Sequence, residues 1–327
     1  MLPIAVDAMG GDRAPDEIVA GARIAAEELG IPVVLVGRPD DLHDTGDLEV
    51  IAASQVIAMD AEPGTSVRTM KDASLVRAAE AVRDGRASAM VSAGNTGAAM
   101  GSALLRMGRI KGISRPAIAT PIPTPGGTPT TMLDAGANAE CRPEWLVQFA
   151  RMGTVYARDR FGIGRPRVGL LSIGEEAAKG SPFVKEVFGL LRDGSWARSV
   201  DADWIGNVEG RDIMTPEVDV VVTDGFTGNV TLKALEGAMR ALVGRLLVAI
   251  DTDDATRAAG DVLKPALDAM IAELHPDSVG GALLLGVNGV CVISHGSSGS
   301  AAMVNAIRVA SEMVEAEMVA HIEQTAV

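Results

Sequence analysis

The chain has 327 residues and a formal net charge of -14 at pH 7; 47% of its residues are hydrophobic but only 3% are aromatic. A chain this long can bury a large core, and one this acidic lacks the basic face of a general nucleic-acid-binding protein. Cys141 and Cys291 are too few for a disulfide framework and have no metal-ligand spacing. Residues 1–7 lack the features of a signal peptide and no run of about 18 apolar residues occurs, so we expect a cytoplasmic protein.

Short β-rich runs recur along the chain, and helical segments lie between them. The expected strands are residues 4–6, 32–36, 50–57, 89–91, 117–120, 131–133, 168–172, 204–205, 218–223 and 289–293. The clearest expected helices are residues 15–29, 72–83, 143–158 and 300–322. This alternation predicts an α/β fold of three layers, with a mostly parallel sheet covered by helices on both faces. The chain shows no repeat or linker, so we expect a single domain over residues 1–327.

Residues 231–278 are the most distinct segment. They predict two helices, roughly 232–250 and 256–274, joined by an acidic turn at residues 251–254. The first helix is apolar over much of its circumference, which is typical of a buried or dimer-forming surface or of one that touches a membrane. The acidic turn disfavours strong attraction to anionic lipid. We therefore expect a protruding helical hairpin inserted into the domain.

Four loops of small and polar residues follow expected strands. They contain Ser92, Asn95 and Thr96; Asn138; Gly225–Asn229; and His295 in the run 295–300. Glycine lets the backbone approach a ligand closely, and free N–H groups at the start of a helix favour an anion. Because active sites of such sheets lie beyond the carboxyl ends of the strands, the four loops predict the rim of one phosphate-handling pocket.

These loops, in this order, resemble those of the phosphate acyltransferases, the acyl-carrier-protein:phosphate transacylases of bacterial phospholipid synthesis. The matching segments span nearly the whole chain and are residues 4–12, 92–98, 108–116, 134–138, 168–171, 179–180, 205–209, 222–230 and 295–298. The resemblance implies transfer of a long-chain acyl group from the carrier-protein thioester to inorganic phosphate, giving acyl phosphate. It also implies a fold similar to the isocitrate and isopropylmalate dehydrogenases, a homodimer and loose, peripheral membrane association.

Lys179 and Asn229 match positions that this family associates with catalysis. We expect Lys179 to bind phosphate or the oxyanion and Asn229 to orient the carbonyl; the alternatives are a solvated residue at a helix start and a turn residue. Ser92, Asn95, Thr96 and Asn138 are second candidates for phosphate or acyl contacts, or they merely close turns.

His295 is expected to donate to phosphate or to protonate the leaving thiolate, or it is a structural loop residue. The four dispersed histidines favour no metal site, and the resemblance implies no cofactor.

A cluster of cations lies within ten residues of an otherwise acidic chain. Its members are Arg106, Arg109, Lys111 and Arg115. Such a cluster suits docking of the acidic carrier protein and would act mainly on the association rate; the alternative is an ordinary solvated charge run.

Three other functions remain open. An acetyl- or butyryltransferase using coenzyme A would have related chemistry, whereas a dehydrogenase of the same fold would need an acidic metal cluster that the sequence does not show. A membrane-surface scaffold would bind lipid without turnover.

Overall fold

Most of the strands form because short apolar runs are buried on both faces. The computed structural model describes residues 1–274 and 276–326. In β1 (Ile4–Asp7), Ile4 and Val6 face one hydrophobic cluster while Ala5 faces the other. The remaining strands are β2 (Val33–Gly37), β3 (Glu49–Ala52), β4 (Ala89–Ser92), β5 (Ala117–Ile122), β6 (Thr130–Leu133), β7 (Arg167–Leu171), β8 (Asp203–Val208), β9 (Val220–Val222), β10 (Ala282–Leu285) and β11 (Val290–Ile293). Continuous apolar runs of this kind are typical of sheets covered on both sides.

These strands make one 11-stranded sheet in the order β3-β2-β1-β4-β11-β10-β5-β6-β9-β7-β8. The antiparallel pairs lie at its centre, between β11 and β10, β10 and β5, and β5 and β6. The pairs on either side of this centre are parallel. The strands from β3 to β11 therefore run in the opposite direction to those from β6 to β8.

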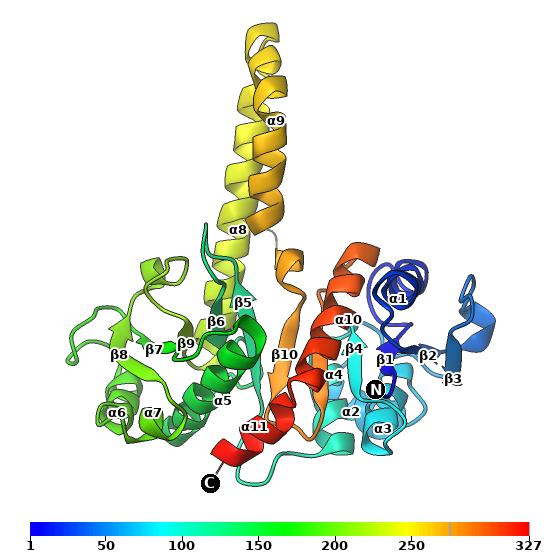
Figure 1. Cartoon of the computed structure of the whole chain (residues 1–327), viewed down its shortest axis with the longest axis horizontal. Helices are drawn as coiled ribbons and strands as arrows, with labels where there is room; N and C mark the ends of the chain where they lie inside the picture. Colours follow the sequence, from blue (N-terminus) through cyan, green and yellow to red (C-terminus); the bar gives the residue numbers. More distant parts are fainter. Residues whose placement is uncertain (275, 327) are drawn as a thin grey trace.

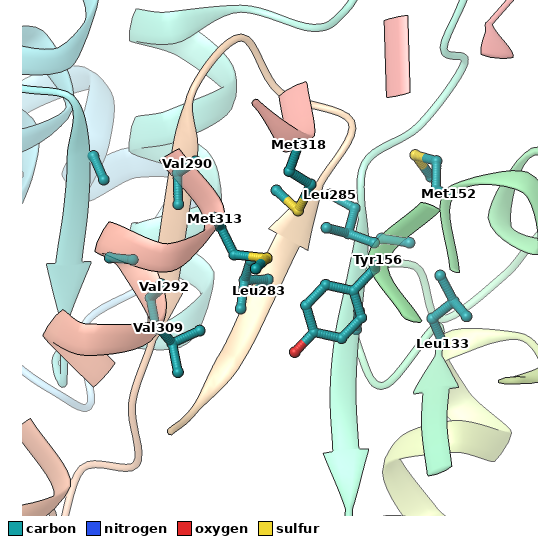
Figure 2. Close-up of a cluster of buried hydrophobic side chains, with 14 of the residues drawn as sticks. Leu133, Met152, Tyr156, Leu283, Leu285, Val290, Val292, Val309, Met313 and Met318 are labelled. Atoms are coloured by element: carbon teal, nitrogen blue, oxygen red, sulfur yellow. The ribbon is translucent and has the colours of Figure 1, made fainter. Parts of the chain in front are cut away.

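Helices cover both faces of the sheet and complete three layers (Figure 1). One face carries α1 (Asp16–Leu29), α5 (Pro143–Phe161), α6 (Pro182–Leu191), α7 (Ser195–Ser199), α10 (Ser300–Glu315) and α11 (Met318–Thr325). Figure 2 shows part of this core, in which Met152 and Tyr156 of α5 and Met313 of α10 lie around Leu283 and Leu285 of β10. The other face carries α2 (Pro63–Thr69), α3 (Ser74–Arg83) and α4 (Thr96–Ser102), together with the base of α8 (Gly225–Ile250).

Two long helices, α8 (Gly225–Ile250) and α9 (Asp254–Leu274), lie side by side and project from the sheet (Figure 1). Helix α8 begins at Gly225, earlier than the sequence predicts, because the Asp224 side chain accepts a hydrogen bond from Thr227 N and caps the helix. The two helices pack closely where Gly260 meets Ile250. Residue 275, within the predicted 231–278 segment, lies outside the described residues.

Several sequence-based expectations differ from the structure. The expected strand 50–57 is shorter, because β3 ends at Ala52. The expected helix 300–322 is divided into α10 and α11, because Glu317 adopts a left-handed conformation with φ of 53°. Strand β10, with the sequence Ala-Leu-Leu-Leu, has no counterpart among the expected strands. It runs antiparallel to both of its neighbours, so the alternation of strands and helices gave no sign of it.

Candidate active-site cleft

A cleft of about 240 Å³ opens on the face of the sheet that carries α4 and the base of α8. Helix α4 supplies one wall, consisting of Gly97, Met100 and Gly101, with Leu104 of the following turn. The opposite wall is made of Arg115, Pro116, Ala137 and Asn138, and Leu284 of β10 also lines the space. The cleft thus has an apolar side and a polar side, and each side comes from a different half of the sheet.

The polar wall is organised by the buried carboxylate of Asp134. Its Oδ1 accepts hydrogen bonds from the backbone N–H groups of Ile118 at 3.0 Å, Gly136 at 3.1 Å and Ala137 at 2.9 Å. Its Oδ2 accepts from Asn138 N at 2.7 Å and from Asn138 Nδ2 at 2.9 Å. Burial raises the pKa of Asp134, and the hydrogen bonds from Ala137, Asn138 and Ile118 act against that rise. One carboxylate therefore fixes the whole loop from Asp134 to Asn138.

The start of α8 packs directly on this loop. Gly225 N donates to Asn138 O at 2.9 Å, and a Cβ at Gly228 would lie 2.0 Å from Asp134 O. Only glycine allows this approach. One turn along, Asn229 is exposed, and its Nδ2 donates to Ala135 O at 3.3 Å. Asn229 therefore contacts the same loop that carries Asn138, although Asn229 itself does not line the cleft.

Lys179 lies in the loop that follows β7. Its side chain is exposed, its backbone N donates to Glu176 O at 2.9 Å, and Asn207 Nδ2 holds the same oxygen at 3.0 Å. Strands β6, β9 and β7 are neighbours and run parallel, so their carboxyl ends lie about 4.8 Å apart from strand to strand. Lys179 thus projects from the same end of the sheet as the loops of Asn138 and Asn229.

The other predicted site residues belong to the opposite half of the sheet. Ser92 is fully buried, where its Oγ donates to Asp7 Oδ2 at 2.7 Å and accepts from Gly94 N at 3.0 Å. Asn95 caps α4 by accepting from Ala98 N, and its Nδ2 donates to Met59 O and Ala61 O. Both side chains are occupied in holding the backbone.

Thr96 and His295 are exposed at that end of the sheet, and His295 Nδ1 lies 2.8 Å from Ser297 Oγ. Neither side chain lines the cleft. The four predicted loops therefore form two groups rather than one rim, because β4 and β11 run opposite to β6 and β9.

The four cations expected to dock the carrier protein are also divided. Arg106 is turned inward, with Nε 3.7 Å from Glu80 Oε1. Arg109 is exposed and donates to Ser114 O, and Lys111 is exposed. Arg115 lines the cleft, and its guanidinium lies 5.1 Å from the centre of the Trp145 ring. This position of Arg115 could not be predicted from the sequence, because only the fold places residues 115–116 opposite α4.

Cys141 lies next to the polar wall, where its Sγ donates to Asn138 O at 3.6 Å. Burial raises the pKa of this thiol to about 11, so it is protonated near neutral pH and is a poor nucleophile. Among residues 1–274 and 276–326, no group of three His, Cys, Asp or Glu side chains is placed to hold a metal ion. Within the same residues, no helix combines the length and apolarity needed to cross a bilayer.

Comparisons with known proteins identify the family. Residues 2–321 match the family model described as "Fatty acid synthesis protein". The chain is 48% identical to a phosphate acyltransferase from Heliobacterium modesticaldum, covering 98% of this chain and 96% of the relative. It is 46% identical to a phosphate acyltransferase from Elusimicrobium minutum, covering 98% and 95%.

Solved structures agree at the level of the fold. A branched-chain phosphotransacylase from Enterococcus faecalis has a TM-score of 0.61 at 14% identity, over 96% of this chain and 99% of its own. A phosphotransacetylase from Staphylococcus aureus has a TM-score of 0.59 at 15% identity, over 96% of this chain and 94% of its own. The mixed α/β architecture is shared with these enzymes. With near-complete coverage by its curated relatives, the chain belongs to the phosphate acyltransferase family and is an acyltransferase.

Proposed function

We propose that this enzyme transfers a long-chain fatty acyl group from acyl carrier protein to inorganic phosphate, giving acyl phosphate for phospholipid synthesis. The observation that carries the proposal is the two-sided cleft. Its polar wall offers Arg115 and Asn138 to an anion, while Met100, Leu104 and Leu284 offer apolar surface to an acyl group. A cleft of about 240 Å³ is below the roughly 300–1,000 Å³ of ordinary ligand sites. It suits the reacting end of the substrate, with the rest of the chain lying beyond it.

Phosphate is itself a nucleophile near neutral pH, so the protein need not supply one. A phosphate oxygen attacks the thioester carbonyl carbon, the C–S bond breaks, and the proton of hydrogen phosphate passes to the departing thiolate. The protein must position the two substrates, which is worth up to about 7–11 kcal/mol, and stabilise the oxyanion, at about 3–4 kcal/mol for each donor. We assign the oxyanion to the ammonium of Lys179 and the orientation of the carbonyl to Asn229.

The remaining roles follow from exposure and charge. Arg109 and Lys111 are exposed cations and are proposed to receive the acidic carrier protein. Thr96 and His295 are proposed as outer contacts of the substrates, and Ser92 and Asn95 as positioning residues for α4. The enzyme is proposed to act as a cytoplasmic homodimer, with weak peripheral membrane contact through α8 and α9 and with no nucleic-acid partner.

The test is release of free carrier-protein thiol from purified long-chain acyl carrier protein as phosphate is varied, with the matching acyl-coenzyme A in parallel. We expect saturable release, with acyl phosphate formed one-for-one and the carrier thioester preferred. Preference for coenzyme A would indicate the acetyl- or butyryltransferase type of donor. No release from either donor would reject the proposed reaction.

A further inference from the structure

We propose that Arg115 and Asn138 form the subsite that binds the phosphate co-substrate, and that Asn138 selects a protonated oxyanion. This assignment rests on the proposed function and removes Arg115 from the carrier-docking cluster. It also leaves Lys179 free for the oxyanion.

Arg115 is placed to receive an anion. Of the described residues that line the cleft, only Arg115 has a charged side chain. Its neighbours in sequence are committed elsewhere, since Arg106 pairs with Glu80 and Arg109 donates to Ser114 O. Arg115 instead packs on Trp145 and forms no ion pair with a carboxylate of the described residues. Stacking on an aromatic ring restrains a guanidinium and leaves its N–H groups available for a fork-like contact with an oxyanion.

Asn138 offers the complementary group, a hydrogen-bond acceptor. Its Nδ2 already donates to Pro116 O at 2.8 Å and to Asp134 Oδ2 at 2.9 Å. Both partners are acceptors, so the orientation of the amide is fixed by its hydrogen bonds. Asn138 lines the cleft, and its amide oxygen is the polar atom of this side chain that these hydrogen bonds leave for a ligand. The backbone cannot shift easily, because Asn138 N and O are bonded to Asp134 and Gly225.

This combination has a chemical consequence. Hydrogen phosphate carries both acceptor oxygens, which suit Arg115, and one P–OH donor, which suits the Asn138 oxygen. Sulfate has the same shape and charge but no proton near neutral pH. It would place an oxygen against the acceptor of Asn138, and such a pairing is unfavourable. The subsite should therefore prefer phosphate and arsenate over sulfate.

The experiment uses the full chain and varies phosphate and acyl carrier protein separately. For Arg115→Gln we expect the KM for phosphate to rise about 10- to 100-fold, the span of a lost hydrogen bond to a charged group. The KM for the acyl carrier protein should stay within about twofold. Arg115→Lys should recover part of the loss. Arg86→Gln is the matched control, since it removes the same charge from an exposed site outside the cleft, and it should leave the KM for phosphate unchanged.

A rise in the KM for the carrier protein alone would overturn the assignment and return Arg115 to docking.

Phosphorus NMR line broadening supplies a readout that needs no turnover. Wild-type chain should broaden the phosphate signal, sulfate should compete at least about 10-fold more weakly than arsenate, and Arg115→Gln should abolish the broadening. Asn138→Ala should remove the preference for arsenate over sulfate. Broadening without any thiol release would reject the proposed reaction but keep the anion subsite, whereas release with unchanged broadening in Arg115→Gln would reject the subsite alone.

Discussion

Lys179 is exposed and its side chain makes no ion pair or hydrogen bond within the described residues, so its replacement should not disturb the fold. Loss of an oxyanion donor lowers turnover by about 10²–10³-fold, and we expect that loss in kcat for Lys179→Ala. The control is Lys185→Ala, which removes an exposed ammonium from the nearby helix α6. Steady-state kinetics and thermal unfolding check both variants; a kcat close to that of wild type in Lys179→Ala would remove the residue from the mechanism.

The buried carboxyl of Asp7 leads to a prediction about pH. Burial raises its pKa above 3.8, although hydrogen bonds from Ser74, Ser92 and Met9 act against the rise. The folded state then favours the protonated form. The contribution of Asp7 to stability is therefore largest below pH 3.8 and is lost as the pH rises through the raised pKa. As the pH rises from 3.8 through the raised pKa, the free energy of unfolding of Asp7→Asn should therefore increase relative to that of wild type.

Asp72 provides a control of opposite sign. Hydrogen bonds from Ser54 lower its pKa below 3.8, so its contribution is present above that value and is lost as the pH falls through the lowered pKa. The free energy of unfolding of Asp72→Asn should therefore decrease relative to that of wild type as the pH rises. Urea unfolding over a pH range that extends well below and well above 3.8 measures both differences. A difference for Asp7→Asn that does not change with pH would contradict the argument.

Residue identity alone indicates the placement of some candidate residues but not of others. Asn138 and Asn229 follow β6 and β9, which are adjacent parallel strands, and both contact the loop from Asp134 to Asn138. Ser92 and Asn95 have the same appearance in the sequence, yet their hydrogen bonds are spent on Asp7 and on the cap of α4. In the sequence, Arg115 is one member of a run of cations. Its position in the cleft depends on Trp145 and Asn138, which are distant from it in the sequence. What a polar loop residue faces depends on tertiary contacts that its own segment does not encode.

At the scale of the elements, buried strands were the easiest to predict. Runs such as Val33–Gly37 and Arg167–Leu171 are apolar, β-branched or leucine-rich and bounded by turn residues. Strand β10 was not predicted because Ala-Leu-Leu-Leu suits a helix as well as a strand, and because no helix separates it from β11. The break between α10 and α11 escaped because it rests on the single left-handed residue Glu317.

Packing between α8 and α9 depends on the absence of a side chain at Gly260. A Cβ there would lie 2.1 Å from Ile250 Cγ2, so Gly260→Ala should force the helices apart at a cost of about 1–3 kcal/mol. We expect faster proteolysis near residues 251–263. Gly237→Ala and Gly244→Ala are controls, because nothing lies within 4 Å of the new methyl group and each should stabilise its helix by about 0.5–1 kcal/mol. Adding Ile250→Ala to Gly260→Ala should restore resistance; unchanged proteolysis in Gly260→Ala would show that the contact is unimportant.

At the scale of the whole molecule, the reversal of strand direction at β10 and β5 determines where the cleft forms. A fully parallel sheet would place all the polar loops at one edge. Here the strands of the two halves run in opposite directions. The cleft lies between α4 of one half and the Asp134–Asn138 loop of the other. Any relative movement of the two halves would change the distance between the apolar and polar walls. The cleft is therefore a property of the whole sheet rather than of one loop.

The projecting helices α8 and α9 expose several large apolar side chains to solvent. Val262 is 81% exposed, Leu242 is 71% exposed, and Leu247, Val248 and Leu263 are also exposed. Many exposed apolar side chains on one pair of helices are typical of a contact surface. If this pair touches lipid, Val262→Glu should lower the fraction of protein that floats with phosphatidylcholine vesicles severalfold, because a charge must then enter the interface. Lys264→Gln changes the net charge by the same amount on an already polar position and should float like wild type.

The same surface predicts a weak dependence on lipid charge. The turn between the helices carries Asp251, Asp253 and Asp254, which repel an anionic headgroup. Raising the phosphatidylglycerol content should therefore add little to flotation, and salt should have little effect on it. Binding that rises steeply with anionic lipid would assign the membrane contact to another, basic surface such as that of Arg109 and Lys111. Flotation that is unchanged in Val262→Glu, together with a lower sedimentation mass, would instead make this face the surface on which two copies of the chain meet.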